Sequence, residues 1–232
     1  MAPQTQFSLA GIELSTTIDS AAALPDLVRT VTDICGRAED APEGGALLLR
    51  LTGTASDDHT AGFTGAAFTG VHQVNKWERA LRRLERVPVA TVAVATGDCS
   101  GPAADALLTT DYRIAGSGLR LRLAAVGGTT WPGMALYRLA QQIGVGRARR
   151  LALFGIEMTA WQALELGLVD EVSDDTESAL SVALHGLTGE RGQDVAVRRR
   201  LLMDASSISF EDALGPHLAA CDRSLRRAVA AS

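Results

Sequence analysis

The backbone groups and side chains best suited to chemistry lie together in residues 87–115. The apolar run 89–95 predicts a strand buried on both faces. A glycine turn at 97–101 ends that strand, and residues 103–108 have the composition of a helix. A helix that starts after such a turn presents backbone N–H groups that can hold a negatively charged oxygen.

A second group of polar side chains, Asp57, Asp58 and His59, occupies a glycine-containing loop. They could be metal ligands or an acid–base pair, but three adjacent residues rarely point the same way, so a solvated loop is favoured and no metal site is predicted. Cys99, in the glycine turn, could be a nucleophile. No histidine accompanies it in the sequence, so a small residue in a tight turn is favoured.

Length and composition limit the classes of protein that this chain can belong to. Its 232 residues are enough for one domain with a sizeable core, and its net charge of −5 does not favour nucleic-acid binding. The apolar runs stay short of the ~18 residues that a membrane span needs, and the N-terminus lacks the basic flank and apolar stretch of a signal peptide. We therefore expect a cytoplasmic protein that binds neither nucleic acid nor membranes.

Alternating strands and helices are expected to position the turn. Residues 7–15 alternate as a first strand, and Asp19 or Ser20 is expected to cap a helix that follows it. Residues 46–51 read as a buried strand, and a long amphipathic helix is predicted at about 66–87. This order predicts an α/β fold of repeating strand and helix units.

The chain beyond the turn is predicted to be largely helical. Residues 119–123 alternate leucine and arginine, which predicts a strand whose arginines face solvent or a polar partner. Pro132 is expected to start the next helix, and Thr159 with Gln162 has the spacing of a capping box. Residues 175–232 show helical patterns and no strand pattern.

Several of these segments carry motifs of a known family. They are P-V-A-T-V-A-V-A-T-G followed by S-G-P-A-A-D-A-L-L-T-T-D-Y-R-I-A, W-P-G followed by Y-R-L-A-Q-Q-I-G, and R-A-R-R-L-A-L-F-G ending in L-G-L-V-D-E-V. Together they resemble the crotonase (enoyl-CoA hydratase/isomerase) superfamily over roughly residues 45–172. The resemblance implies a spiral core of stacked β-β-α turns at 1–172, and a helical region at 173–232 that builds trimers or hexamers.

The resemblance also implies a site that handles acyl-CoA thioesters, with no permanently bound cofactor. Two backbone N–H groups would hold the thioester oxygen, and the family's helix-borne acid falls on Asp105. The family's glycine donor falls on Pro102, which has no N–H, so Gly101 or Ala103 would have to donate instead. The family's second acid falls on Ala125, so this chain lacks it.

Residues 74–86 and the short length most resemble the auxiliary DpgB-type branch of the superfamily. That branch implies a hydratase- or dehydratase-like lyase that assists formation of 3,5-dihydroxyphenylacetyl-CoA from a polyketide-CoA intermediate, in antibiotic biosynthesis. Its partner would be a polyketide synthase or a second crotonase-family enzyme. Two alternatives stay open: a catalytically silent subunit that binds a partner enzyme, and an isomerase or decarboxylase that uses one acid.

Overall fold

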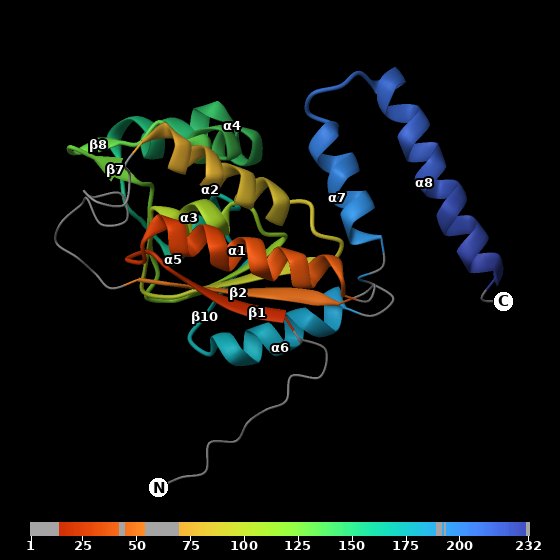
Figure 1. The fold of residues 1–232 in the computed structure, drawn as a ribbon, viewed down its shortest axis with the longest axis horizontal. Coiled ribbons are helices and arrows are strands. Elements are labelled where there is room, and N and C mark those ends of the chain that lie inside the picture. Colours follow the sequence, from red (N-terminus) through yellow and green to blue (C-terminus); the bar gives the residue numbers. More distant parts are fainter. Residues whose placement is uncertain (1–13, 42–44, 54–69, 189–191, 193, 231–232) are drawn as a thin grey trace, which may run out of the picture.

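A five-stranded parallel sheet forms the centre of the fold (Figure 1). The computed structural model describes residues 14–41, 45–53, 70–188, 192 and 194–230. In these ranges the strand order of the sheet is β1-β2-β3-β5-β10. The five strands are β1 (Leu14–Asp19), β2 (Ala46–Thr52), β3 (Ala90–Ala95), β5 (Tyr112–Gly116) and β10 (Glu171–Ser173).

Strand β3 lies in the middle of the sheet and pairs with β2 on one side and β5 on the other. All six of its residues are buried. A strand with neighbours at both edges and helices over both faces needs an uninterrupted apolar run, which its sequence A-T-V-A-V-A supplies. The predicted α/β class and the buried central strand are therefore confirmed.

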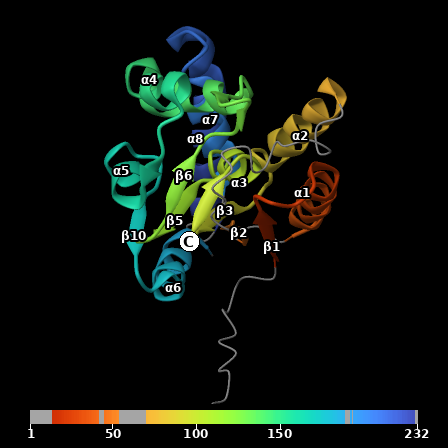
Figure 2. The ribbon, with the colours of Figure 1, turned by 90° about the vertical axis from the view of Figure 1, so that its left-hand side faces the viewer.

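Helices cover the two faces of the sheet unequally, as the two views in Figures 1 and 2 show. One face packs against α1 to α5 in a large apolar cluster, whereas α6 covers the other face with a smaller cluster. No helix of the described ranges is long and apolar enough to cross a membrane. The helices are α1 (Leu24–Glu39), α2 (Val71–Leu84), α3 (Pro102–Leu107), α4 (Met134–Phe154), α5 (Ala160–Glu165), α6 (Thr176–Leu187), α7 (Val195–Asp204) and α8 (Phe210–Ala230).

Two smaller strand groups flank the start of α3. A three-stranded sheet has the order β4-β6-β9, and β7 pairs with β8 as a hairpin. These strands are β4 (Asp98–Ser100), β6 (Arg120–Arg122), β9 (Met158–Thr159), β7 (Ala125–Val126) and β8 (Thr129–Thr130). Because β4 leads directly into the turn before α3, this small sheet sets the position of that turn.

The first helix begins later than the sequence predicts. Strand β1 continues to Asp19, which pairs with Thr52 of β2, so neither Asp19 nor Ser20 caps a helix. Helix α1 starts at Leu24 after Ala23, with Pro25 in its first turn. Pairing with β2 therefore overrides the local capping signal.

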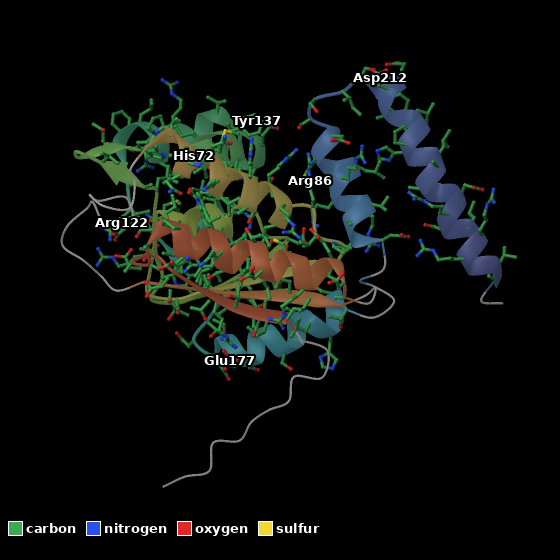
Figure 3. The ribbon with its side chains drawn as sticks, viewed as in Figure 1. His72, Arg86, Arg122, Tyr137, Glu177 and Asp212 are labelled. Atoms are coloured by element: carbon green, nitrogen blue, oxygen red, sulfur yellow. The ribbon has the colours of Figure 1, made fainter. Side chains whose placement is uncertain are left out.

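Helix α4 begins at Met134 after Gly133, two residues later than the start predicted at Pro132, whereas the helices that follow agree with the sequence. The capping box of Thr159 and Gln162 is present at the start of α5. Residues beyond 175 form helices α6, α7 and α8. Glu177, near the start of α6, lies below the sheet in Figure 3 and pairs with Arg50 of β2 through both carboxylate oxygens. Helix α6 is thus an integral part of the sheet's second layer.

Arg199 connects α7 to the central sheet. Its side chain is 8 % exposed, and its Nε donates to Asp111 Oδ1 at 2.6 Å. The guanidinium also donates to the backbone carbonyls of Val87 at 2.7 Å and Val89 at 2.8 Å, which lie just before β3. Asp111 accepts a further hydrogen bond from the backbone of Thr91. A planar guanidinium with five donors suits such a multiple contact, which a lysine could not make.

We expect Arg199→Ala to lower the free energy of unfolding by about 3 kcal/mol, because it leaves Asp111 and two strand-edge carbonyls without their partner. Arg200→Ala on the same helix is the control, since the Arg200 side chain is 83 % exposed and its loss should cost less than about 0.5 kcal/mol. Urea unfolding monitored by circular dichroism measures both. Equal effects of the two substitutions would contradict a role for Arg199 in joining α7 to the sheet.

Candidate functional site

The turn before α3 requires glycine at one position. Gly101 has φ of 51° and ψ of −122°, a backbone conformation that residues with a Cβ rarely adopt. Pro102 follows as the first helical residue, where its fixed φ and missing N–H fit a helix start. The next N–H groups at this end of α3 are therefore those of Ala103 and Ala104, and all six residues of the helix are buried. This is the turn at which the family resemblance implies a thioester-holding amide.

The end of β2 approaches the same turn closely. Gly53 follows β2, and a Cβ built on it would lie 2.2 Å from the backbone oxygen of Asp98 in β4. The hydroxyl of Ser20 lies on the other side, at 2.0 Å from that Cβ position. Only glycine leaves room for this approach, which fixes the end of β2 against the strand that leads into α3.

Asp105, the predicted acid, is 5 % exposed. The indole of Trp77, from α2, donates its Nε1–H to Asp105 Oδ2 at 3.0 Å. Burial raises the pKa of the Asp105 carboxyl from its ordinary value to about 7, against the lowering effect of the Trp77 hydrogen bond. The negative charge of Glu78 raises this pKa further, and the positive charge of Arg138 lowers it. Asp105 therefore exchanges its proton near neutral pH.

Arg138, from α4, is buried but makes no direct ion pair with Asp105 in the described part of the chain. Its Nε donates to Glu85 Oε1 at 2.7 Å and its Nη1 donates to Glu78 Oε2 at 3.0 Å, so both of its contacts go to α2. These two carboxylates already compensate its charge. Asp105 consequently lies beside a cation without being paired to it, which is why burial dominates its pKa.

The position that the family motif assigns to a second acid holds Ala125, the first residue of β7, which pairs with Thr130 of β8. The hairpin therefore carries a methyl group where a second carboxyl group would be needed. Asp57, Asp58 and His59 lie outside the described residues. Within the described residues no group of three or more metal-ligating side chains occurs.

The arginines of β6 face a polar partner, as the alternating pattern predicts. Arg120 donates to both carboxylate oxygens of Glu157, at 2.8 and 2.9 Å. Arg122, labelled in Figure 3, pairs with the buried carboxylate of Asp98 in β4. These ion pairs join β4, β6 and the segment before β9. Because β4 leads into the turn before α3, they stabilise the position of that turn.

Cys99 has no catalytic environment. It is fully buried in β4, and burial together with the charges of Asp98 and Asp105 raises the pKa of its thiol well above the ordinary value. A thiol that stays protonated at neutral pH is a poor nucleophile. This environment favours the interpretation of Cys99 as a small residue in a tight turn.

Sequence reasoning missed Trp77, Glu78 and Arg138 as neighbours of the acid. The helical periodicity of α2 predicts that Trp77 is buried, which it is. The indole N–H of Trp77 could be paired with Asp105 only once the packing of α2 on α3 was known. Helical periodicity predicts which face of a helix is buried, but it does not predict which residue that face contacts. No signal in a single sequence distinguishes this tryptophan from a purely apolar core residue.

Comparisons with known proteins agree with this architecture. A family model described as enoyl-CoA hydratase/isomerase matches residues 60–188. A relative from Amycolatopsis orientalis named "Enoyl-CoA-hydratase" is 47% identical over 216 residues, which are 93% of this chain and 97% of the relative.

Two solved structures illustrate the likeness in fold. A putative enoyl-CoA hydratase/isomerase from Mycobacterium abscessus has a TM-score of 0.73 at 23% identity, covering 90% of this chain and 86% of its own. A putative enoyl-CoA hydratase from Streptomyces coelicolor A3(2) has a TM-score of 0.72 at 19% identity, covering 97% and 88%. The family model and the close relative together establish that this chain belongs to the enoyl-CoA hydratase/isomerase, or crotonase, family.

Proposed function

We propose that this protein is a hydratase- or dehydratase-like lyase that acts on acyl-CoA thioesters with Asp105 as its proton-transferring residue. The observation that carries the proposal is the environment of Asp105. It occupies the position of the family's helix-borne acid, it is buried, and its pKa of about 7 matches the value that suits a general acid or base at neutral pH. A carboxyl group with no functional role would normally be exposed or paired.

One carboxyl group is sufficient for elimination of water from a β-hydroxyacyl thioester. Protonated Asp105 gives its proton to the departing β-hydroxyl, which leaves as water, and the Asp105 carboxylate takes up the proton lost from the α-carbon. The products are the enoyl thioester and water, and Asp105 returns to its starting protonation state. The reaction is redox-neutral, so it needs no electron acceptor or donor.

The thioester oxygen gains negative charge as the α-proton leaves, and a backbone N–H at the start of α3 is proposed to stabilise it. Pro102 has no N–H, so Ala103 or Gly101 takes this role. An amide that is fixed by the helix before the reaction needs no reorganisation when charge develops.

The more specific proposal is a DpgB-type role, in which the protein assists formation of 3,5-dihydroxyphenylacetyl-CoA from a polyketide-CoA intermediate. The resemblance at residues 74–86 supports it, whereas the missing second acid at Ala125 favours the catalytically silent alternative. Aromatisation of a polyketide chain requires successive losses of water, and each β-hydroxyl lost in this way fits the one-acid elimination. A polyketide synthase or a second crotonase-family enzyme is the proposed partner.

A catalytically silent, partner-binding subunit is the second candidate, and helix α8 favours it. None of the residues of α8 is buried, and the helix stands away from the sheet in Figure 1. Its apolar residues recur at intervals of three and four, which places them on one face of the helix. They are Phe210, Leu214, Leu218, Cys221, Leu225 and Val229. Such a face suits a second chain, either another copy in a trimer or hexamer or a partner enzyme.

We expect Asp105→Asn to lower the turnover of acyl-CoA thioesters by at least ~10², because the amide keeps the shape of the side chain but cannot exchange a proton. Asp105→Glu should retain part of the activity. Mass spectrometry of a panel of acyl-CoA thioesters, with and without a polyketide synthase, measures the rates. Asp33→Asn, an exposed carboxyl on α1, is the matched control.

Calorimetry with coenzyme A measures binding separately from turnover in these variants. The Asp105→Asn protein should bind coenzyme A with the same affinity as the unmodified protein. An unchanged rate of product formation in Asp105→Asn would show that the carboxyl is structural. The silent-subunit candidate would then be favoured.

The raised pKa of Asp105 also predicts a pH-dependent stability. Between about pH 4 and pH 7 the folded protein keeps a proton on Asp105 that the unfolded chain has released, so raising the pH favours unfolding. The stability of the unmodified protein should therefore fall over this window, relative to Asp105→Asn, by roughly 2–3 kcal/mol between pH 5 and pH 8. Urea unfolding at both pH values tests this. Parallel pH profiles of the two proteins would contradict the raised pKa.

Removal of α8 should reduce the oligomeric state. We expect light scattering to report a trimer or hexamer for the full chain, and a smaller species for a chain that ends at Ile208, because the apolar face of α8 is then lost. The shortened chain keeps α6 and Arg199, so its sheet remains covered. A monomeric full-length chain at micromolar concentration, or a shortened chain of unchanged oligomeric state, would contradict the proposal.

A further inference from the structure

Trp77 has the properties of a group that orients the acid and does not merely fill space. Its side chain is 1 % exposed, so its indole N–H needs a protein partner to avoid an unsatisfied donor. That partner is Oδ2 of Asp105, at 3.0 Å. In the described part of the chain no hydrogen-bond donor contacts Oδ1, the other carboxyl oxygen. The two oxygens of the acid therefore have different surroundings.

We propose that Trp77 is a positioning residue that determines which oxygen of Asp105 exchanges the proton. An indole N–H can only donate, so Oδ2 must remain an acceptor in both protonation states. A carbonyl oxygen accepts more strongly than a carboxylic hydroxyl oxygen, so this hydrogen bond favours the neutral acid in which Oδ1 carries the proton. The proposal rests on the proposed function in one respect only: the proton on Oδ1 would be the one exchanged with a bound thioester.

The polar and charged groups around Asp105 shift its pKa in opposite directions, which makes the proposal testable. The hydrogen bond from Trp77 stabilises the carboxylate and lowers the pKa of Asp105, whereas the negative charge of Glu78, the next residue of α2, raises it. Arg138 of α4 lowers it. Cys99 of β4 also faces Asp105, but the pKa of its buried thiol is raised far above neutrality, so it stays uncharged over the relevant pH range.

The first test needs no substitution of Trp77. The chain has three tryptophans, and their indole N–H resonances can be followed by ¹H–¹⁵N NMR as the pH is raised from 5 to 9. The Trp77 resonance should shift with a midpoint near pH 7, because the acceptor Oδ2 gains charge when Asp105 loses its proton. Trp161, which is 61 % exposed, serves as the internal reference. In Asp105→Asn the shift of Trp77 should disappear.

The second test compares two neighbouring residues of α2. Trp77→Phe removes the donor but keeps an aromatic ring, so the midpoint of Asp105, followed by its side-chain carboxyl ¹³C resonance, should rise by about one pH unit. Glu78→Gln removes a negative charge and should lower the midpoint. Trp161→Phe should leave it unchanged.

These outcomes separate the positioning role from the proposed function. A Trp77 resonance that does not titrate, or midpoints that move together in Trp77→Phe and Glu78→Gln, would overturn the positioning role whatever the activity. If the midpoints move in opposite directions and the pH profile of turnover follows them, both proposals are supported. If the midpoints move but the pH profile of turnover does not, Trp77 still orients Asp105, and the catalytic role of Asp105 is overturned. Should Trp77→Phe fail to fold, the titration of the unmodified protein decides alone.

Discussion

Burial of the central strand on both faces is the constraint from which the rest of this fold follows. Strand β3 has no exposed residue, so a layer of helices is required on each side of the sheet. Helices α1 to α5 supply one layer and α6 the other. The C-terminal part of the chain as far as α7 is therefore an integral part of the fold. Helix α6 completes the core, and Arg199 binds the backbone carbonyls just before β3. Helix α8 alone contributes no buried residue.

The same constraint explains the acid. Helix α3 packs against the buried sheet and all six of its residues are buried, so a carboxyl group on α3 is removed from water. A cation close enough to pair with Asp105 would hold its pKa low, but the nearby Arg138 is already bound to two carboxylates of α2. Burial without a paired cation leaves a proton that is exchangeable near neutral pH. The electrostatics of α2 and α4 thus decide the behaviour of a group on α3.

The departures from the family motif are consistent with one another. Pro102 removes one backbone donor and Ala125 stands where the motif has its second acid, so the proposed function relies on a single carboxyl group and on a displaced amide. A chain that retained the carboxyl only for stability would gain by replacing it with an apolar residue, since an unpaired buried carboxyl destabilises the fold above its pKa. The proposed proton transfer would account for a carboxyl group inside an otherwise apolar helix.

The sequence by itself determined the α/β class, the buried strand at β3, the glycine turn, the acid on α3 and the helical C-terminal region. Each of these depends on local composition or on periodicity along the chain. Tertiary structure decided the rest. It extended β1 to Asp19 against a local capping signal, since pairing with β2 supplies hydrogen bonds that the cap cannot equal. It also brought Trp77 to Asp105 and Arg199 to Asp111, pairs separated by 28 and 88 residues. Such contacts depend on how helices pack in three dimensions, which the periodicity of one helix does not encode.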